Sequence, residues 1–471
     1  MTSTGCLING NKLKRGAVLS VRNPYSGETV GEVFQAGSAE VEEALRVGFA
    51  YRCDLTRYQR FEILSRTREA LQARLEEFAV RITSESGLCI RETRYEVGRA
   101  SDVLQFAAIE ALRDDGEIFS CDISPQGKAR KIFTLREPLG LAAAITPFNH
   151  PLNQVVHKVA PAIAAGTPII LKPSEKTPLT AIAFAELLLE NGLPPAMLGV
   201  VLGPTAEVAA QLVSDPRTEL VTFTGSVPVG KRIASTAGYK RVVLELGGND
   251  PLIVLEDADL ELAAILAAEG SFRNSGQRCT AVKRILVVDE IFDRFVNRFV
   301  EKSREYVSGD PMDPATRVGT VIDEASARQL EEAVQDSIRA GAKVLLGGGR
   351  RGALMEPTVI LDVPRNAKMV CEESFGPLAP ILRVKDLDDA IEVANSTAYG
   401  LSSGVVTKRH DYAIRCIKEL RVGTVNINEV PGYRIECSPF GGIKDSGLGI
   451  KEGVIEAMKS MSTVKTFSLP W

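Results

Sequence analysis

The sequence lacks the long apolar runs and the dense basic blocks that mark membrane proteins and nucleic-acid-binding proteins. Its most apolar stretch, residues 159–171, is interrupted by Pro161, Gly166 and Pro168 and falls short of the ~20 residues that a membrane-spanning helix needs. The 56 basic and 60 acidic residues nearly balance, for a formal net charge of -4, and no Lys/Arg cluster could grip a phosphate backbone. We therefore expect neither a membrane nor a nucleic acid as a partner.

Signals of secretion, of metal binding and of disulfide bonding are also missing. Residues 1–16 are polar and hold no apolar core of about 7–15 residues, so we expect no secretory signal and a cytoplasmic location. The eight cysteines are scattered, with no C-x-x-C pair, which predicts no metal site and no disulfide. Most of them should be small core residues, although one could be a free nucleophile.

Length and composition indicate an ordinary globular protein with two large domains. The 471 residues are 45% hydrophobic and 25% charged, close to the globular average. A single core stops growing at roughly 250–300 residues, so the chain should divide.

Hydrophobic periodicity predicts an α/β fold. Apolar residues at spacings of three and four over 61–82 predict one long amphipathic helix. From residue 141 onward, short apolar runs alternate with helix-length segments, which is typical of βαβ units and a mostly parallel sheet. The predicted strands are 141–145, 168–172, 197–202, 220–223, 242–246, 284–288 and 423–428, and the predicted helices include 180–190, 229–236 and 325–341.

Two segments match neither predicted sheet. Residues 122–137 are charged and end in β-branched and aromatic side chains, which is compatible with a protruding hairpin. The last residues, 461–471, could form an edge strand. Both could serve an oligomer interface.

A glycine-rich segment, residues 225–232, nearly matches the phosphate-binding loop of nucleoside triphosphatases. Arg232 stands where Ser or Thr must reach Mg²⁺, so we reject that function. What remains is a strand, a glycine turn and a helix whose N-terminal amides could face a pyrophosphate. A plain strand-to-helix turn would look the same, and no G-x-G-x-x-G supports a standard dinucleotide fold.

Two motifs carry more specific chemistry. In the string NSGQRC, residues 274–279, Cys279 follows a glycine turn and an arginine, the conditions for a depressed thiol pKa and an accessible thiolate nucleophile. In ELGG, residues 245–248, Glu245 ends an apolar strand just before two glycines. This position predicts a carboxylate at the carboxyl edge of the sheet, suited to a general base.

With these motifs the chain resembles the aldehyde dehydrogenase superfamily. The resemblance runs from Asn23-Pro24 through TPFN (146–149), ELGG and NSGQRC to PFGGIKDSG (439–447), in the order and spacing of the family. It implies an α/β fold with a variant Rossmann cofactor domain, a catalytic α/β domain and a small oligomerisation hairpin. The implied boundaries are 1–118 and 138–247 for the NAD-binding domain, 248–445 for the catalytic domain, and 119–137 and 460–471 for the oligomerisation segment.

The resemblance also implies a mechanism. Cys279 would attack the aldehyde carbonyl, and the Asn149 side-chain amide would stabilise the oxyanion beside the Cys279 backbone N–H. After hydride transfer to the nicotinamide, Glu245 would activate the water that hydrolyses the thioester. Members that pass the acyl group to coenzyme A lack this glutamate, so its presence favours release of a free acid.

The implied cofactor is a nicotinamide dinucleotide. Glu175, beside Lys172 at the adenosine ribose, would accept from both ribose hydroxyls and repel a 2′-phosphate, so NAD is favoured over NADP. The full predicted cofactor set is Thr146, Pro147, Phe148, Lys172, Ser174, Glu175, Gly203, Phe223, Thr224, Gly225, Ser226, Gly247, Glu373 and Phe375.

The predicted substrate pocket differs from that of members that oxidise apolar aldehydes. His150 and His157 stand where those members have aromatic side chains, and by alignment Arg99, Arg278 and Arg434 converge on the pocket. Asn149 and Thr280 complete the predicted set. An arginine cluster suits phosphate, phosphonate or carboxylate, and phosphonoacetaldehyde dehydrogenases and non-phosphorylating glyceraldehyde-3-phosphate dehydrogenases look similar here. The alternative is that Arg99 and Arg434 are salt-bridged surface residues and the histidines ordinary helix residues.

We therefore expect NAD-dependent oxidation of a small anionic aldehyde to its acid by a homodimer or homotetramer, with phosphonoacetaldehyde as the first candidate. Glyceraldehyde 3-phosphate, succinate semialdehyde and lactaldehyde are the alternatives. A catalytically silent structural relative is the alternative from another class; the presence of Cys279, Glu245 and Asn149 argues against it.

Overall fold

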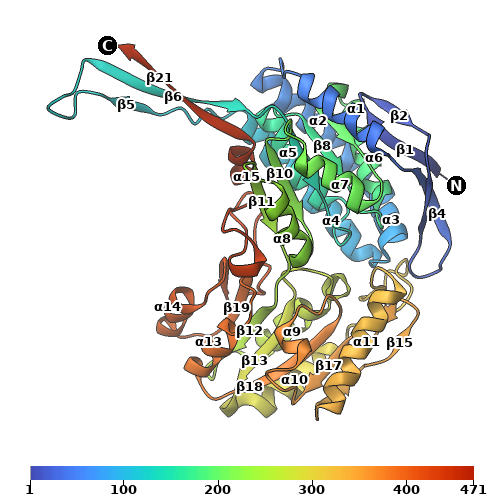
Figure 1. Cartoon of the computed structure of the whole chain (residues 1–471). Helices are drawn as coiled ribbons and strands as arrows, with labels where there is room; N and C mark the ends of the chain where they lie inside the picture. Colours follow the sequence, from blue (N-terminus) through green and yellow to red (C-terminus); the bar gives the residue numbers. More distant parts are fainter. Residues whose placement is uncertain (1) are drawn as a thin grey trace.

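The computed structural model describes residues 2–471, which form two large sheets flanked by helices and a small sheet that projects from them (Figure 1). The α/β class with mostly parallel sheets is confirmed. The predicted domain boundaries stay a prediction.

The first large sheet contains nine strands in the order β11-β10-β7-β8-β9-β1-β4-β3, with β2 paired to β1. Its half from β11 to β9 is parallel, as the apolar runs predicted, and β9 pairs antiparallel with β1. The strands are β1 (Thr2–Ile8), β2 (Asn11–Leu13), β3 (Val18–Arg22), β4 (Thr29–Phe34), β7 (Ala142–Ile145), β8 (Ile169–Lys172), β9 (Leu198–Val200), β10 (Leu220–Thr224) and β11 (Arg241–Glu245).

Helices cover this sheet and share its apolar core. They are α1 (Ser38–Ala50), α2 (Arg57–Ala73), α3 (Leu75–Ser86), α4 (Ile90–Ala111), α5 (Asn153–Ala165), α6 (Pro178–Glu190), α7 (Thr205–Ser214), α8 (Val227–Thr236) and α15 (Val454–Ser460), with a 3₁₀ turn η1 (Pro195–Met197). The single helix predicted over 61–82 is wrong, because Arg74 (φ -107°, ψ 22°) separates α2 from α3. Neither Gly nor Pro marks that break, so periodicity could not find it.

The second large sheet contains seven strands in the order β14-β17-β18-β13-β12-β19-β20, parallel except for the β14/β17 pair. Its strands are β12 (Asp250–Val254), β13 (Val282–Val288), β14 (Lys343–Leu346), β17 (Thr358–Leu361), β18 (Leu378–Val384), β19 (Ser402–Val406) and β20 (Thr424–Ile427). Around it lie the short pair β15 (Arg350–Arg351) and β16 (Leu354–Met355), and the helices α9 (Leu260–Phe272), η2 (Arg273–Gly276), η3 (Asp289–Ile291), α10 (Phe292–Ser303), α11 (Glu324–Arg339), α12 (Lys368–Cys371), α13 (Leu387–Asn395), α14 (His410–Glu419) and η4 (Lys444–Ser446).

The predicted hairpin and edge strand join in one projecting sheet. β5 (Ile118–Ser120) and β6 (Arg130–Pro138) form an antiparallel hairpin, and β21 (Ser462–Pro470) pairs with β6 along its whole length. Figure 1 shows this sheet extending away from both large units, with the C-terminus at its outer end. Among the helices of residues 2–471, none is long and apolar enough to cross a membrane.

Candidate active site

Parallel pairing brings the first group of predicted site residues to one edge. β7, β8, β10 and β11 end at Ile145, Lys172, Thr224 and Glu245, and their register aligns Ile145 with Lys172 and Thr224 with Glu245. The carboxyl ends of parallel strands form the crevice in which α/β proteins bind ligands. Asn149 leaves the same edge in the turn between β7 and α5.

The nucleophile loop is held in an uncommon backbone conformation. Asn274 (φ 57°), Ser275 (φ 53°) and Gly276 (φ 69°) are three consecutive left-handed residues, a conformation costly for non-glycine residues and kept only where the surroundings impose it. Any side chain at position 276 would collide with the backbone of Gly376. Gln277 is fixed as well, because its Oε1 accepts from the Ile322 amide at 2.9 Å.

The Asn149 amide is anchored to this loop. Its Nδ2 donates to the Gln277 carbonyl at 2.8 Å, and its own carbonyl accepts from Asn274 Nδ2 at 3.0 Å. A primary amide has two N–H bonds, so one N–H of Asn149 stays free to stabilise an oxyanion at Cys279.

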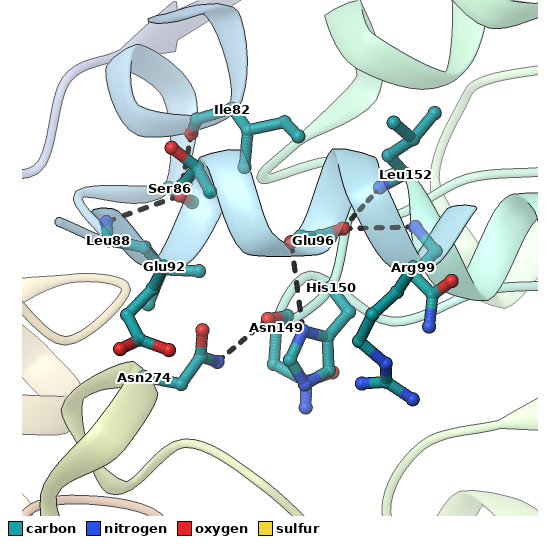
Figure 2. A network of polar contacts seen from close by, with 12 residues as sticks. Ile82, Ser86, Leu88, Glu92, Glu96, Arg99, Asn149, His150, Leu152 and Asn274 are labelled. Carbon is teal, nitrogen blue, oxygen red and sulfur yellow. Dashed lines mark hydrogen bonds and ion pairs between the residues drawn. The ribbon is translucent and has the colours of Figure 1, made fainter. Parts of the chain in front are cut away.

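Helix α4 supports the Asn149 turn from the other side. Glu96 Oε1 accepts from the amides of Leu152 and Asn153 at 2.8 and 3.0 Å and so caps the start of α5, while Oε2 lies 3.6 Å from His150 Nδ1. Figure 2 shows Glu96 reaching His150 and Leu152, and Asn274 reaching Asn149. His150 therefore faces α4 and does not line the cleft described below.

A cleft of 680 Å³ connects these elements. All three predicted catalytic residues line it, together with most of the predicted cofactor residues: Pro147, Phe148, Asn149, Thr224, Gly225, Ser226, Glu245, Gly247, Cys279, Glu373 and Phe375. Phe148 and Phe375 meet edge to face, with ring centroids 5.8 Å apart. A side chain at Gly247 would collide with the Glu373 carboxylate, so the glycine leaves room for Glu373 to lie against this turn.

The predicted adenosine end lies outside the lining of that cleft. Lys172 Nζ is 3.6 Å from Glu175 Oε1, and the same oxygen accepts from Thr205 Oγ1 at 2.8 Å. Ser174 accepts from the Lys176 amide, and Gly203 packs on the Ala36 carbonyl. The structure thus orients the Glu175 carboxylate through two partners, of which Thr205 was not predicted.

The Cys279 thiol is not activated in the way predicted from the sequence. Burial raises the pKa of Cys279 to about 12, and the carboxylates of Glu373 and Asp250 act in the same direction, whereas Arg434 opposes them. The neighbouring Arg278 forms no hydrogen bond with the thiol, and its Nη2 donates to the carbonyls of Glu269 and Gly270 at 3.2 and 2.8 Å.

Burial lowers the pKa of Arg278 to about 10, and its charge interacts with Cys279. Its Nη2 bonds the C-terminal end of α9. The roles of Arg278 in activating the thiol and in reading the substrate stay predictions. Adjacency in the sequence does not decide where a long side chain points.

Glu245 is a buried carboxylate without partners. Both of its oxygens are inaccessible, and neither accepts a hydrogen bond from any residue of 2–471. Burial raises its pKa well above the usual range, and the nearby Glu452 adds to this effect. Glu452 itself is bonded to Lys158 at 2.7 Å and to Thr222 at 3.0 Å. A raised pKa means that the ionised carboxylate binds a proton more strongly. This proton affinity suits a general base that works near neutral pH.

Glu373 lines the cleft and interacts with the charge of the buried Lys283. Burial raises its pKa to about 7, the charge of Lys283 opposes that shift, and the Gly248 amide donates to it at 3.2 Å. Lys283 donates to the Gly276 carbonyl at 2.8 Å. The pair therefore couples the predicted nicotinamide-ribose residue to the nucleophile loop.

Glu436 contacts two of the residues that we expected in the substrate pocket. Arg99 Nε donates to Glu436 Oε1, and His157 Nε2 lies 2.6 Å from Glu436 Oε2. Burial lowers the pKa of His157, although Glu436 opposes the shift, so the ring is neutral at pH 7 and donates its Nε2 proton. Arg99 is salt-bridged, as the alternative held, but its side chain is only 21% exposed and does not lie on the open surface; its role in substrate binding stays a prediction.

Arg434 differs from Arg99 in forming no ion pair, although the charge of Glu436 acts on it. Its guanidinium carbon lies 3.9 Å from the Phe440 ring centroid, and its charge acts on Cys279 and Glu245. No residue of 2–471 accepts a hydrogen bond or forms an ion pair with its guanidinium. The loop that carries it packs on the nucleophile, because a side chain at Gly432 would collide with Thr280 and one at Gly441 would lie 2.7 Å from Glu245 Oε1.

Sequence reasoning missed Glu436, Thr205 and the face of α11. Glu436 follows Arg434 by two residues in the stretch YRIE (433–436), and this pairing of opposite charges was an available signal. The α11 residues Ser326, Gln329 and Ala333 line the cleft, and no motif marks them.

Known proteins resemble the chain throughout its length. The pattern that defines the Aldehyde dehydrogenase family matches residues 12–467. A 3-sulfolactaldehyde dehydrogenase of Priestia aryabhattai is 40% identical over 459 residues, 97% of this chain and 96% of the relative. A mitochondrial succinate-semialdehyde dehydrogenase of Arabidopsis thaliana is 40% identical over 455 residues, 95% of this chain and 85% of the relative.

A solved structure agrees in fold. The NADP-dependent glyceraldehyde-3-phosphate dehydrogenase of Bacillus halodurans C-125, complexed with NADP, superposes with a TM-score of 0.97 at 35% identity, covering 100% of this chain and 99% of that one.

Proposed function

The chain belongs to the aldehyde dehydrogenase family and is an NAD(P)-dependent aldehyde dehydrogenase, and we propose that it oxidises a small anionic aldehyde to its carboxylic acid. The observation that carries the substrate class is the unpaired guanidinium of Arg434 beside Cys279. A desolvated guanidinium is costly without an anion, and a substrate head group supplies one. All three relatives named above carry an anionic aldehyde in their names.

The first half of the reaction is addition at Cys279. The thiol gives its proton to solvent, the sulfur forms a bond to the carbonyl carbon as the C=O π bond breaks, and the oxygen becomes an oxyanion held by the free Asn149 N–H and the Cys279 backbone N–H. An oxidised nicotinamide held in the cleft by Phe148, Glu373 and Phe375 would supply a hydride acceptor and a positive charge that opposes the rise of the thiol pKa to about 12.

The second half is hydrolysis at the same carbon. Loss of hydride leaves a thioester on Cys279. Glu245 then takes a proton from a water molecule as that water attacks the thioester carbon. The C–S bond then breaks, the acid leaves and the thiol is restored. The unpaired oxygens of Glu245 can receive this proton because no protein donor competes for them.

The cleft suits the pyrophosphate and nicotinamide parts of a pyridine nucleotide. The first turn of α8, after Ser226, presents unpaired amides to a pyrophosphate, and Phe148, Glu373 and Phe375 would hold the nicotinamide riboside. We propose NAD over NADP because Thr205 and Lys172 fix the Glu175 carboxylate where a 2′-phosphate would need to lie.

Several anionic aldehydes remain candidates. An anion for Arg434 is present in phosphonoacetaldehyde, glyceraldehyde 3-phosphate and succinate semialdehyde. The 3-sulfolactaldehyde dehydrogenase of Priestia aryabhattai adds sulfonated aldehydes to these candidates. Lactaldehyde is the neutral alternative. An absorbance assay for reduced cofactor, with anionic and neutral aldehydes of equal length, tests the proposal. Higher kcat/KM for the anionic members supports it, and equal values would overturn it.

We also propose that the projecting sheet joins copies of this chain. Its strands expose Ile118, Phe119, Phe467, Leu469 and Trp471, more apolar surface than a lone hairpin keeps in water. Light scattering of Phe467→Lys against wild type would test this, with a smaller particle expected for the variant.

A further inference from the structure

We propose that Glu436 determines substrate specificity by limiting the pocket to head groups with one negative charge, so that sulfonates and carboxylates are preferred to the dianions of phosphates and phosphonates. This inference rests on the proposed oxidation of anionic aldehydes. It goes beyond it by assigning the charge of the substrate to a residue that does not touch the reacting atoms.

Glu436 uses both of its oxygens. Oε1 accepts from Arg99 and Oε2 accepts from His157 at 2.6 Å, and only 5% of the Glu436 side chain is exposed. Burial alone would raise the pKa of Glu436, yet His157, Arg99 and Arg434 together hold it below its ordinary value. Glu436 is therefore ionised at neutral pH, and it forms its ion pair with Arg99.

The charges around Glu436 then leave one neighbouring cation without an ion pair. Arg99 and Glu436 form an ion pair, and His157 is neutral. Arg278 stays charged, but the carboxylates of Glu92 and Glu269 act on it. Asp102 is opposed by Arg68, and Glu96 accepts from the two amides at the start of α5. Of the two arginines that act on Glu436, only Arg434 forms no ion pair within residues 2–471.

One guanidinium can neutralise a sulfonate or a carboxylate fully. It leaves half of a phosphonate dianion uncompensated next to the Glu436 carboxylate, and like charges in a poorly solvated site repel strongly. Phosphate-type groups have a second pKa of ~6, so above pH 8 they are mainly dianions while a sulfonate stays a monoanion. Sulfoacetaldehyde and phosphonoacetaldehyde have the same carbon chain and are the matched pair for a test.

The experiment measures kcat/KM for these two aldehydes at pH 8.5 in wild type, Glu436→Gln and the double variant Arg99→Gln/Glu436→Gln. Wild type should prefer sulfoacetaldehyde at least tenfold. Glu436→Gln removes the negative charge and frees Arg99, so the preference should shift toward phosphonoacetaldehyde by tenfold or more. The double variant again has one uncompensated cation, so its preference should return to within about threefold of wild type.

The return in the double variant separates charge selection from structural damage. Circular dichroism and kcat for a neutral aldehyde of equal length report on folding and on the chemical steps in each variant. If Glu436 only holds the fold together, the double variant will be no better than Glu436→Gln and the ratio of the two anions will stay as in wild type. Either result overturns the inference.

The failure of the proposed function has a different signature. In that case wild type would use the neutral aldehyde as well as both anions, whatever happens in the variants. Preference for both anions over the neutral aldehyde, with a ratio between them that Glu436→Gln leaves unchanged, would retain the function and reject the role of Glu436.

Discussion

Two buried regions near Cys279 hold their charges in opposite ways: the floor, which is Cys279 and Glu245, and the cluster of Glu436 with Arg99, His157 and Arg434, which we call the mouth. At the floor, both oxygens of Glu245 lack partners, and burial raises the pKa values of Glu245 and Cys279. At the mouth, both oxygens of Glu436 are bonded, and the pKa of this carboxyl is lowered. The pKa values of these two buried glutamates are thus shifted in opposite directions.

The difference follows from what each region must do. Glu245, as the base, must exchange a proton, so its oxygens make no hydrogen bonds to the protein, at a cost in stability. Glu436, as a positioning residue, must hold its neighbours, so both of its oxygens are hydrogen-bonded. Variants at the two regions should therefore differ in kind as well as in size.

The largest effect is expected at Cys279. Cys279→Ser should reduce turnover by roughly 10⁴-fold or more, because an alcohol is hardly ionised where even the thiol resists ionisation. Binding of reduced cofactor, followed by fluorescence, should be unchanged. Substantial remaining activity in a clean preparation would remove Cys279 from the mechanism.

Glu245→Gln should slow steady-state turnover by roughly 10²–10⁴-fold while sparing the first hydride transfer. A stopped-flow burst of about one reduced cofactor per site, with a trapped thioester, is the expected signature. Because the pKa of Glu245 is raised, the base is lost as pH falls through that value, so the kcat of wild type should rise with pH. A variant with no burst would show that Glu245 acts before hydride transfer.

Arg434 tests the mouth. Arg434→Gln should lower the ratio of kcat/KM for a charged aldehyde to that for a neutral one by at least tenfold, about 1.4 kcal/mol. Arg434→Lys keeps the charge and should recover part of the ratio, whereas loss on all substrates alike would mean that Arg434 serves the thiol and not the head group.

Cofactor preference should be a smaller effect. Wild type should favour NAD over NADP about tenfold in kcat/KM, and Thr205→Val should narrow the gap by releasing Glu175 from one of its two partners. Glu175→Gln is the matched control that removes the charge itself. Equal use of both cofactors by wild type would contradict the assignment of Glu175.

The smallest effect separates the two glutamates directly. Glu245→Gln removes an unpaired buried carboxyl whose raised pKa makes the fold less stable as pH rises, so the apparent Tm at pH 7.5 should hold or increase. Glu436→Gln leaves Arg99 without its carboxylate and should cost about 1–3 kcal/mol, or roughly 1–3 °C in a chain of this length. Equal losses in the two variants would break the comparison.

Local patterns were enough to predict the floor of the pocket. A glycine turn before Cys279, a glutamate at the end of a strand and the alternation of strands with helices are all short-range signals. Parallel pairing then brings Glu245 and Asn149 to one edge. The strands 141–145, 220–223 and 242–246 lie within a residue or two of β7, β10 and β11.

The mouth could not be predicted in the same way. The contact of His157 with Glu436 joins residues 279 positions apart, and that of Arg99 with Glu436 joins residues 337 apart. Arg278 follows the same rule, because its place beside Cys279 in the chain gave no sign that its Nη2 bonds the carbonyls of Glu269 and Gly270. Pairing of charges across elements depends on the assembled fold.

The residues that set charge at the mouth occupy one short connection. Arg434 and Glu436 lie between β20 and Phe440, while Cys279, Glu245 and Asn149 come from three other segments. A duplicated gene could therefore acquire a new substrate preference through a few codon changes within this connection, with the catalytic segments untouched. The architecture separates what can diverge from what must stay.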